Sequence, residues 1–458
     1  MLRLNAIEIA LIEAGIGIGG HTIVLTVANV RRPNAVILGL MPHPRSIATI
    51  RSLGRAGIKL LGFDHIQPPH RAYTRYLKSS NCHVLSSPAA VLTALLEGAA
   101  EVGAVLFPTS DEYLILLSQN HDQLSERYIV TCPPWRDLQR IMNIAECYDL
   151  GRKCGIATPE YYVPRNDEDL SQLIHSLDCE SHTYLVRTMP GAAPANPDNH
   201  RYTRIAGRTK ADILATCQEI KQRTGFIPTI VEVVPGEAKD CLGVTLVMDR
   251  NSDPVVAYGL QRLSLYTYLS DRCRMPGAVT HPYELGALVY CESRHDPEAM
   301  DKAITLAKAA GFYGAITVEF RRNIANGQLT LIKCDPRVVR ATSLSTALGV
   351  DVPNAVYEAF TGLRPERRLN VRDGVGWLWI SQFAEALWNN RDEIEARRVL
   401  LKLFSKIWRI RSFAFLSITD PLPFFTHLYW RLCSRLQMRR DVDPVSELHT
   451  SASQAEVD

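Results

Sequence analysis

The chain has 458 residues, of which 46% are hydrophobic, so it can bury the cores of two to four domains. Its formal net charge of +3 is too small to favour nucleic acid, membrane or an acidic partner for the chain as a whole. The eleven cysteines are odd in number and contain no CxxC pair. This argues against a zinc site and a disulfide framework, and favours a reducing, cytoplasmic location.

Residues 1–32 are predicted to be an extension without a core of its own. The apolar stretch over residues 7–30 is interrupted by Glu8, Glu13 and His21, so we expect neither a membrane-spanning helix nor a signal peptide. Four glycines over residues 15–20 imitate a nucleotide-binding loop. They lack the strand before and the acidic residue after that such a loop needs.

Alternating strand and helix patterns predict a small doubly wound parallel sheet over residues 33–132. The turn at residues 108–112 lies at the carboxyl end of a predicted strand, where open α/β sheets bind ligands. Ser110 or Asp111 would alternatively cap the helix that follows. The strands are expected at 35–40, 59–63 and 104–107, and the helices at 46–56, 88–101 and 111–127.

A second α/β unit is predicted over residues 133–363, with a small subdomain at 133–235 and a large one at 236–363. Apolar spacing and turn signals define its elements. Two short helices are expected over 135–155, strands at 184–187, 229–234, 241–248 and 255–261, and a helix over 296–311.

The segment 314–350 is predicted to begin with a β-hairpin. Residues 315–320 alternate between apolar and polar, residues 329–334 are apolar again, and Asn326-Gly327 between them is a strong reversal signal. A polar segment with two arginines follows before the next helix.

The register of this hairpin decides what faces Glu319. A two-residue loop places Glu319 opposite Cys334, whereas a three-residue loop with left-handed Gly327 places it opposite Lys333. In both registers Glu319 lies near Asp335, so anionic groups lie beside cationic groups that could hold a phosphate.

Residues 364–458 form an aromatic and basic C-terminal region that is expected to end in a disordered acidic segment. Between residues 396 and 440 there are ten Lys or Arg and one acid, Asp420. The patterns at 399–410 and 423–438 predict amphipathic helices with basic polar faces. Such helices pack against the rest of the chain or a homodimer partner, or lie on anionic lipid at the inner face of a membrane. No nucleic-acid-binding module frames them, so nucleic acid is not an expected partner.

One string carries a resemblance to a known family. Asp335-Pro336-Arg337-Val338-Val339-Arg340-Ala341-Thr342-Ser343-Leu344, after the Val318-Glu319-Phe320 strand, resembles the nucleotide site of ATP-grasp ligases. The likeness is strongest to the large subunit of carbamoyl-phosphate synthase and to carboxylate-amine ligases, and it extends over residues 33–363. It implies an α/β ATP-grasp fold preceded by a pre-ATP-grasp domain with a doubly wound parallel sheet.

The resemblance implies an enzyme that uses ATP to phosphorylate a carboxylate and lets an amine displace the phosphate. A small-molecule acid and a small-molecule amine are then its expected substrates. It also implies roles for individual residues: Arg187 on the α- or β-phosphate, Glu232, Glu237 and Asp240 around the ribose, Glu319 and Asp335 on magnesium, and Arg262, Arg337 and Arg340 on the oxygens that react.

Two departures weaken the expected phosphate grip. The family carries a lysine near the start of the second helix within 135–155, where this chain has Asn143, Ile144 and Glu146. The loop at 188–197 should be rich in glycine, but it has one glycine and three prolines, which supply no N–H.

A third departure concerns the metal. Lys333 stands where the family places a glutamate that bridges two ions. A like unit charge at about 4 Å from an ammonium costs on the order of 4 kcal/mol at an effective dielectric of 20. We therefore expect one Mg²⁺ at most. Lys333 either binds phosphate in place of the second ion or forms a salt bridge with Glu319 or Asp335. The alternative to a ligase is a non-catalytic protein that keeps this architecture for binding or as a scaffold.

Overall fold

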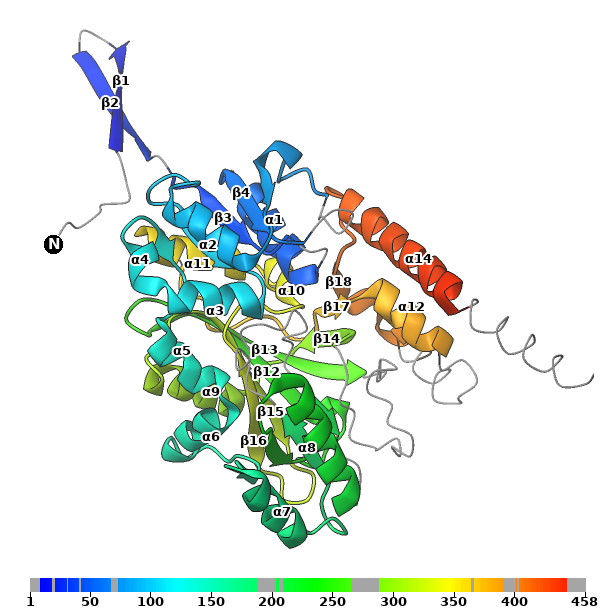
Figure 1. The fold of residues 1–458 in the computed structure, drawn as a ribbon. Helices are drawn as coiled ribbons and strands as arrows, with labels where there is room; N and C mark the ends of the chain where they lie inside the picture. Colours follow the sequence, from blue (N-terminus) through cyan, green and yellow to red (C-terminus); the bar gives the residue numbers. More distant parts are fainter. Residues whose placement is uncertain are drawn as a thin grey trace, which may run out of the picture.

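The structure is a computed structural model. It describes residues 9–18, 21–30, 32–40, 43–66, 73–187, 203–205, 209–264, 288–363, 366–389, 401 and 403–442. These residues form sheets of two, five, four and seven strands (Figure 1).

The two-stranded sheet lies in the N-terminal extension. β1 (Ile9–Ile18) and β2 (His21–Val30) pair antiparallel, with Ile18 opposite His21. Figure 1 shows this hairpin extending away from the body of the molecule. We expected an extension without a core here, and the paired strands go beyond that prediction.

The five-stranded sheet confirms the predicted doubly wound parallel sheet. Its order is β5-β4-β3-β6-β7 and all its pairs are parallel. The chain winds from β3 in one direction and returns to β6 on the other side, so the switch point lies between β3 and β6. The elements are β3 (Ala35–Leu38), α1 (Pro44–Arg55), β4 (Leu60–Asp64), η1 (Ser79–Asn81), β5 (Cys82–Val84), α2 (Pro88–Leu96), β6 (Val105–Pro108), α3 (Asp111–Gln119), α4 (His121–Ser125) and β7 (Ile129–Val130).

Two residues favour the start of helices at this switch point. Pro44 is the first residue of α1, where its missing N–H costs nothing. The Ser110 hydroxyl accepts a hydrogen bond from the Tyr113 N–H. Ser110 therefore caps α3, which confirms the alternative that Ser110 rather than Asp111 is the cap. Asp111 is therefore released from capping and can face elsewhere.

The four-stranded sheet, ordered β10-β9-β11-β8, carries α7 and α8. Leu170, Ile174, Val186 and Ile213 meet in its core. The preceding helices α5 (Trp135–Met142) and α6 (Ile144–Lys153) confirm the two short helices expected there. The other elements are β8 (Tyr161–Tyr162), α7 (Asp167–Ser176), β9 (Tyr184–Arg187), β10 (Thr203–Ile205), α8 (Lys210–Thr224) and β11 (Thr229–Glu232).

The seven-stranded sheet, ordered β16-β15-β12-β13-β14-β17-β18, contains the predicted hairpin. Glu319 pairs with Lys333 and Gly327 has φ +72°, as the second register predicts. Arg322, however, pairs with Leu329, so the connection spans residues 323–328 and both predicted loop lengths are wrong. A bulge between Glu319 and Phe320 separates this pairing from the rest of the hairpin. The elements before the C-terminal region are η2 (Ala238–Asp240), β12 (Cys241–Met248), β13 (Pro254–Ser264), β14 (Tyr290–Ser293), α9 (Pro297–Ala309), β15 (Gly314–Arg322), β16 (Leu329–Asp335), α10 (Thr342–Ala347) and α11 (Val352–Thr361).

The C-terminal region contributes two strands to the same sheet. β17 pairs with β14, and β18 pairs with β17 in parallel. Trp377 is fully buried, and its Nε1–H donates to the Ser343 hydroxyl over 2.9 Å. The region therefore packs against the rest of the chain, while the domain boundaries at residues 32, 132 and 363 stay predictions. Its elements are β17 (Gly376–Leu378), α12 (Ile380–Asn389), η4 (Ile407–Arg409), β18 (Ile410–Phe413) and α14 (Leu422–Val442).

α14 confirms the predicted helix over 423–438. The helix predicted over 399–410 is helical at its described residues up to 406, but its end is wrong, because η4 follows and Ile410 begins β18. Of the helices in the described ranges, none is both long and apolar enough to cross a membrane.

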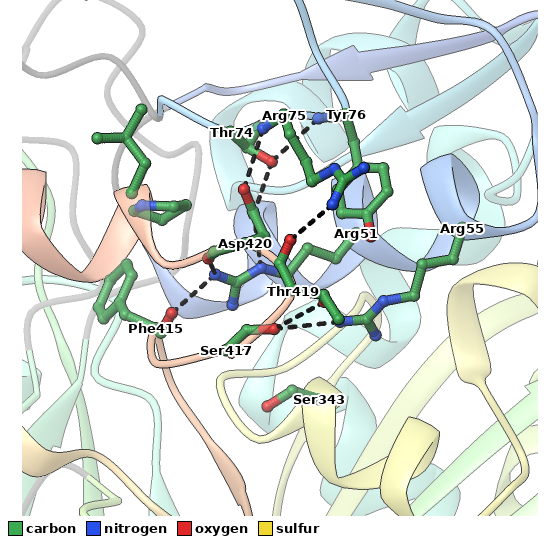
Figure 2. A network of polar contacts seen from close by, with 12 residues as sticks. Arg51, Arg55, Thr74, Arg75, Tyr76, Ser343, Phe415, Ser417, Thr419 and Asp420 are labelled. Carbon is green, nitrogen blue, oxygen red and sulfur yellow. Dashed lines mark hydrogen bonds and ion pairs between the residues drawn. The ribbon is translucent and has the colours of Figure 1, made fainter.

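A buried ion pair ties the C-terminal region to α1 (Figure 2). The Arg51 Nε lies 2.8 Å from the Asp420 Oδ2, and both side chains are almost inaccessible. The Thr74 hydroxyl and the backbone N–H of Arg75 also donate to the Asp420 carboxylate. The Arg51 Nη2 donates to the Phe415 carbonyl. The only acid among residues 396–440 is thus neutralised inside the protein.

Candidate functional site

Three charged side chains meet on one face of the large sheet. The Lys333 Nζ lies 3.3 Å from Glu319 Oε1 and 2.7 Å from Asp335 Oδ2. Glu319 and Lys333 are cross-strand partners, and residues two apart on β16 share a face, which explains the convergence. Arg262 on β13 approaches from the other side, with its Nη2 3.0 Å from Glu319 Oε2.

The same contacts continue to the parallel sheet. Arg337 follows β16 and holds Asp111, the first residue of α3, with Nε–Oδ1 at 2.6 Å and Nη2–Oδ2 at 3.1 Å. Its Nη2 also lies 3.6 Å from Asp335 Oδ1. We call the resulting row the ion-pair chain. It runs through Arg262, Glu319, Lys333, Asp335, Arg337 and Asp111, and its three cations and three carboxylates balance.

Burial and neighbouring charges oppose each other along this chain. Burial acts to raise the pKa of Glu319, but the charges of Arg262 and Lys333 outweigh it and hold that pKa below its usual value. Burial also acts to lower the pKa of Arg337, yet Asp111 and Asp335 outweigh it and raise that pKa. Glu319 and Arg337 are therefore charged at neutral pH.

The arrangement does not fit a magnesium ion between Glu319 and Asp335. The Lys333 ammonium is within 3.3 Å of both carboxylates, where a shared cation would lie. Within the described ranges, no group of three or more His, Cys, Asp or Glu side chains could hold a metal. The predicted salt bridge of Lys333 is present and joins both acids, while its role toward phosphate stays a prediction.

Arg187 reaches β16 from the smaller sheet. Its Nη1 donates to the Ile332 carbonyl over 3.4 Å, and the Tyr148 hydroxyl on α6 donates to the same oxygen over 2.8 Å. The Arg187 Nε is buried and has no hydrogen-bond partner among the described residues. A buried guanidinium N–H without an acceptor suits an anion such as a phosphate group. The loop predicted at 188–197 lies outside the described residues.

The three acids predicted to lie near the ribose are found at the end of β11 (Glu232) and in the segment that follows it (Glu237 and Asp240). Glu232 Oε1 lies 3.4 Å from His182 Nε2, and burial raises the pKa of Glu232. Glu237 pairs with Lys239, and the Asp240 carboxylate accepts the Glu237 N–H over 2.7 Å. Among the described residues, these three acids form no hydrogen bond or ion pair with members of the ion-pair chain, so their roles stay predictions.

Asn143 occupies the position at which a lysine was expected. Its side-chain oxygen accepts hydrogen bonds from the N–H groups of Ala145 and Glu146. It therefore caps α6.

Arg340 lies beside the ion-pair chain rather than in it. Its guanidinium carbon is 5.8 Å from the centroid of the Trp379 ring. His43, at the start of α1, contacts the same indole at 6.1 Å, edge to face. Sequence reasoning did not single out His43, its neighbour Arg45 or Tyr148. Arg45 could have been found, because it follows the carboxyl end of the strand predicted at 35–40, where open α/β sheets bind ligands.

Comparison with known proteins identifies the architecture. No protein-family model matches the chain, and no curated protein sequence matches it. Among solved structures, the biotin carboxylase domain of *Hydrogenobacter thermophilus* 2-oxoglutarate carboxylase matches with a TM-score of 0.56 and 13% identity, over 76% of this chain and 74% of that one. The chain has the ATP-grasp fold.

Two further structures agree with the ATP-grasp assignment. Biotin carboxylase from *Campylobacter jejuni* matches with a TM-score of 0.52 and 14% identity, over 74% of each chain. N5-carboxyaminoimidazole ribonucleotide synthetase, solved with ADP, matches with a TM-score of 0.52 and 14% identity, over 74% of this chain and 80% of that one. The structural likeness establishes the ATP-grasp fold alone, and the activity has to be argued from the site.

Proposed function

We propose that this protein is an ATP-dependent carboxylate-amine ligase that forms an amide-type bond through an acyl phosphate. The observation that supports it most is the convergence on β16 of Arg187, from the small sheet, and the ion-pair chain, from the large one. In an ATP-grasp fold this is the place between two subdomains where nucleotide and acid would meet.

The reaction we propose needs groups that hold anionic oxygens still. Arg187 binds the α- or β-phosphate of ATP, and Glu232, Glu237 and Asp240 surround the ribose. The terminal phosphoryl group passes to a carboxylate oxygen of the acid and ADP leaves. The amine nitrogen then attacks the acyl carbon, and inorganic phosphate leaves. Arg262, Arg337 and Arg340 stabilise the oxygens during both steps, which is an electrostatic task.

We also propose that Lys333 supplies the positive charge that a metal would otherwise supply. A single Mg²⁺ bound by Glu319 and Asp335 would first have to displace the ammonium from both carboxylates. Displacing it would place a divalent ion beside a lysine, which is electrostatically costly.

An assay of ADP release with paired acids and amines tests the ligase proposal. We expect ADP only when an acid and ATP are both present, and an amide product when the amine is added. Arg187→Ala should lower the rate at least about tenfold, because a charge-assisted contact to phosphate is lost. Arg165→Ala is the matched control, since Arg165 is exposed and pairs with Asp169 within its own turn.

A non-catalytic binding protein is the second candidate. The observation that favours it is the balance of the ion-pair chain, whose carboxylates are already neutralised by the protein's own cations. ATP binding without ADP release across the whole panel would support this candidate over the ligase.

We further propose a cytoplasmic protein whose C-terminal region contacts anionic lipid. Several large apolar side chains there are exposed, including Trp408 at 81%, Tyr429 at 68% and Phe404 at 60%. Asp420, the only acid between residues 396 and 440, is buried, so the charged side chains exposed in the described part of that stretch are basic. Exposed aromatic and basic side chains together suit a membrane interface with anionic lipid.

Flotation with vesicles tests this contact. We expect binding to phosphatidylglycerol vesicles, weaker binding to phosphatidylcholine vesicles, and a loss of several-fold in Phe404→Ala/Trp408→Ala. Ile324→Ala, which removes another exposed apolar side chain far from this region, is the control. Equal binding to both vesicles, or none, would reject the proposal. A homodimer through the same surface would instead appear as a concentration-dependent mass in light scattering.

A further inference from the structure

Two guanidinium groups near the site are not used by the ion-pair chain. The Nε of Arg45, the second residue of α1, is buried and has no hydrogen-bond partner among the described residues. The guanidinium of Arg340 forms no hydrogen bond or ion pair within the described part of the chain and lies over the ring of Trp379. Buried N–H groups of charged side chains are normally satisfied, so the Arg45 Nε calls for an acceptor.

The nearby carboxylates are already engaged by other cations. Asp111 is held by both nitrogens of Arg337, and Asp335 is held by Lys333 and Arg337. Since the three cations and three carboxylates of the ion-pair chain balance, Arg45 and Arg340 add two further positive charges beside it. Burial and the charge of Arg337 lower the pKa of Arg45 to about 9, which is the response of a cation held among like charges.

The fold places this positive charge at a position suited to ligands. Arg45 lies in the first turn of the helix that follows β3, next to the switch point between β3 and β6. The Ser46 hydroxyl lies 2.9 Å from the Thr109 hydroxyl, which joins the start of α1 to the end of β6. Gly39 has φ +97°, and a Cβ there would lie 2.7 Å from Thr109 Oγ1, so glycine is needed for this junction.

His43 adds a donor without adding charge. Its Nδ1 accepts from the Arg45 N–H over 3.4 Å, which leaves the ring proton on Nε2. Burial, followed by the charges of Arg45 and Arg340, holds the pKa of His43 well below its usual value. His43 and Arg340 meet at Trp379, whose own Nε1–H is already bonded to Ser381. Trp379 therefore forms an apolar wall next to the Arg340 cation and the neutral His43 ring.

We propose that Arg45 and Arg340 bind a second anionic group, a carboxylate or a phosphate, on the acid substrate. Two guanidinium groups match the oxygens of either anion, and the neutral imidazole of His43 supplies a further donor. The naming of this ligand as the acid substrate rests on the proposed ligase function, while the anion site itself does not. The site lies on the side of β16 that faces the parallel sheet, and Arg187 approaches β16 from the smaller sheet.

Calorimetric titration with inorganic phosphate and with succinate tests the site, and the two probes show which anion it prefers. We expect the wild-type protein to bind at least one of them, with affinity at least about tenfold weaker in Arg45→Gln and in Arg340→Gln. Arg55→Gln, an exposed arginine at the other end of α1, should bind like wild type. Matching thermal melts show that the variants are folded.

The outcomes separate this proposal from the proposed ligase function. Anion binding that needs Arg45 and Arg340 but not Arg187 supports the site, whether or not ADP release is detected. ATP binding that needs Arg187 in a protein that binds neither probe overturns the anion site and leaves the ligase proposal standing. Probe binding that is unchanged in both Arg45→Gln and Arg340→Gln also overturns it.

Discussion

The Lys333 ammonium lies 2.7 Å from the Asp335 carboxylate on the same face of β16, and 3.3 Å from Glu319 on the neighbouring strand. A protein side chain thus takes the position between two acids that were predicted to bind a metal. The consequence is a site whose charges are balanced before any ligand arrives.

Replacing Lys333 should therefore create a metal response. In Lys333→Gln the two acids lose their shared cation, and we expect the free energy of unfolding to fall by about 1–3 kcal/mol, less than for a fully buried pair because Lys333 is partly exposed. Millimolar Mg²⁺ should then raise the melting temperature of the variant and not that of the wild type. Lys302→Gln, which breaks an ion pair on α9, is the control. An equal rise in the melting temperature of the wild type and the variant on adding Mg²⁺ would contradict this prediction.

Acid should loosen the attachment of the C-terminal region to β14. Burial acts to raise the pKa of Glu292, but hydrogen bonds from Tyr290, Lys406 and Arg409 outweigh it and lower that pKa below its usual value of 4.5. The folded state therefore binds this proton less readily than the unfolded state. The stability that Glu292 contributes is complete above about pH 4.5 and is lost as the pH falls through the lowered value.

Glu292→Gln isolates that contribution. We expect the variant to be less stable than the wild type at neutral pH and to lose less stability on acidification, as measured by urea unfolding across the acidic range. Parallel pH profiles for the two proteins would show that Glu292 does not carry the effect.

The pair between Arg51 and Asp420 should be among the most costly to break. Both side chains are buried, so Asp420→Ala leaves a guanidinium without its carboxylate, and we expect a loss of about 3–5 kcal/mol. Limited proteolysis should then cut the C-terminal region faster. Ser417→Ala, which removes two exposed contacts, to Arg55 over 3.5 Å and to the Thr419 hydroxyl over 3.2 Å, should melt nearly like wild type. Equal melting temperatures of Asp420→Ala and Ser417→Ala would contradict this prediction.

Local patterns explain why much of the fold could be predicted. The parallel sheet follows from repeated strand and helix periods, and the hairpin follows from Asn326-Gly327 between two strand patterns. The register of the hairpin stayed open because both loop lengths fit the same reversal. The observed connection, residues 323–328, is longer than both, and the bulge after Glu319 brings Glu319 opposite Lys333.

The site was predictable where its residues lie in one motif. Glu319, Lys333, Asp335 and Arg337 come from the hairpin and the segment after it, and the structure brings them together. The grip of Arg337 on Asp111 joins residues 226 positions apart, and no local pattern encodes such a contact. The short strands β17 and β18 also escaped prediction, since their neighbours in the sheet lie far away in sequence.

The account depends most on nucleotide binding by Arg187 at a site that has its own cations. Calorimetry with ATP in the presence of EDTA measures this directly. We predict that the wild-type protein and Arg165→Ala bind ATP without magnesium, and that Arg187→Ala binds at least about tenfold more weakly. Absence of binding at millimolar ATP, or equal binding by Arg187→Ala, would contradict it.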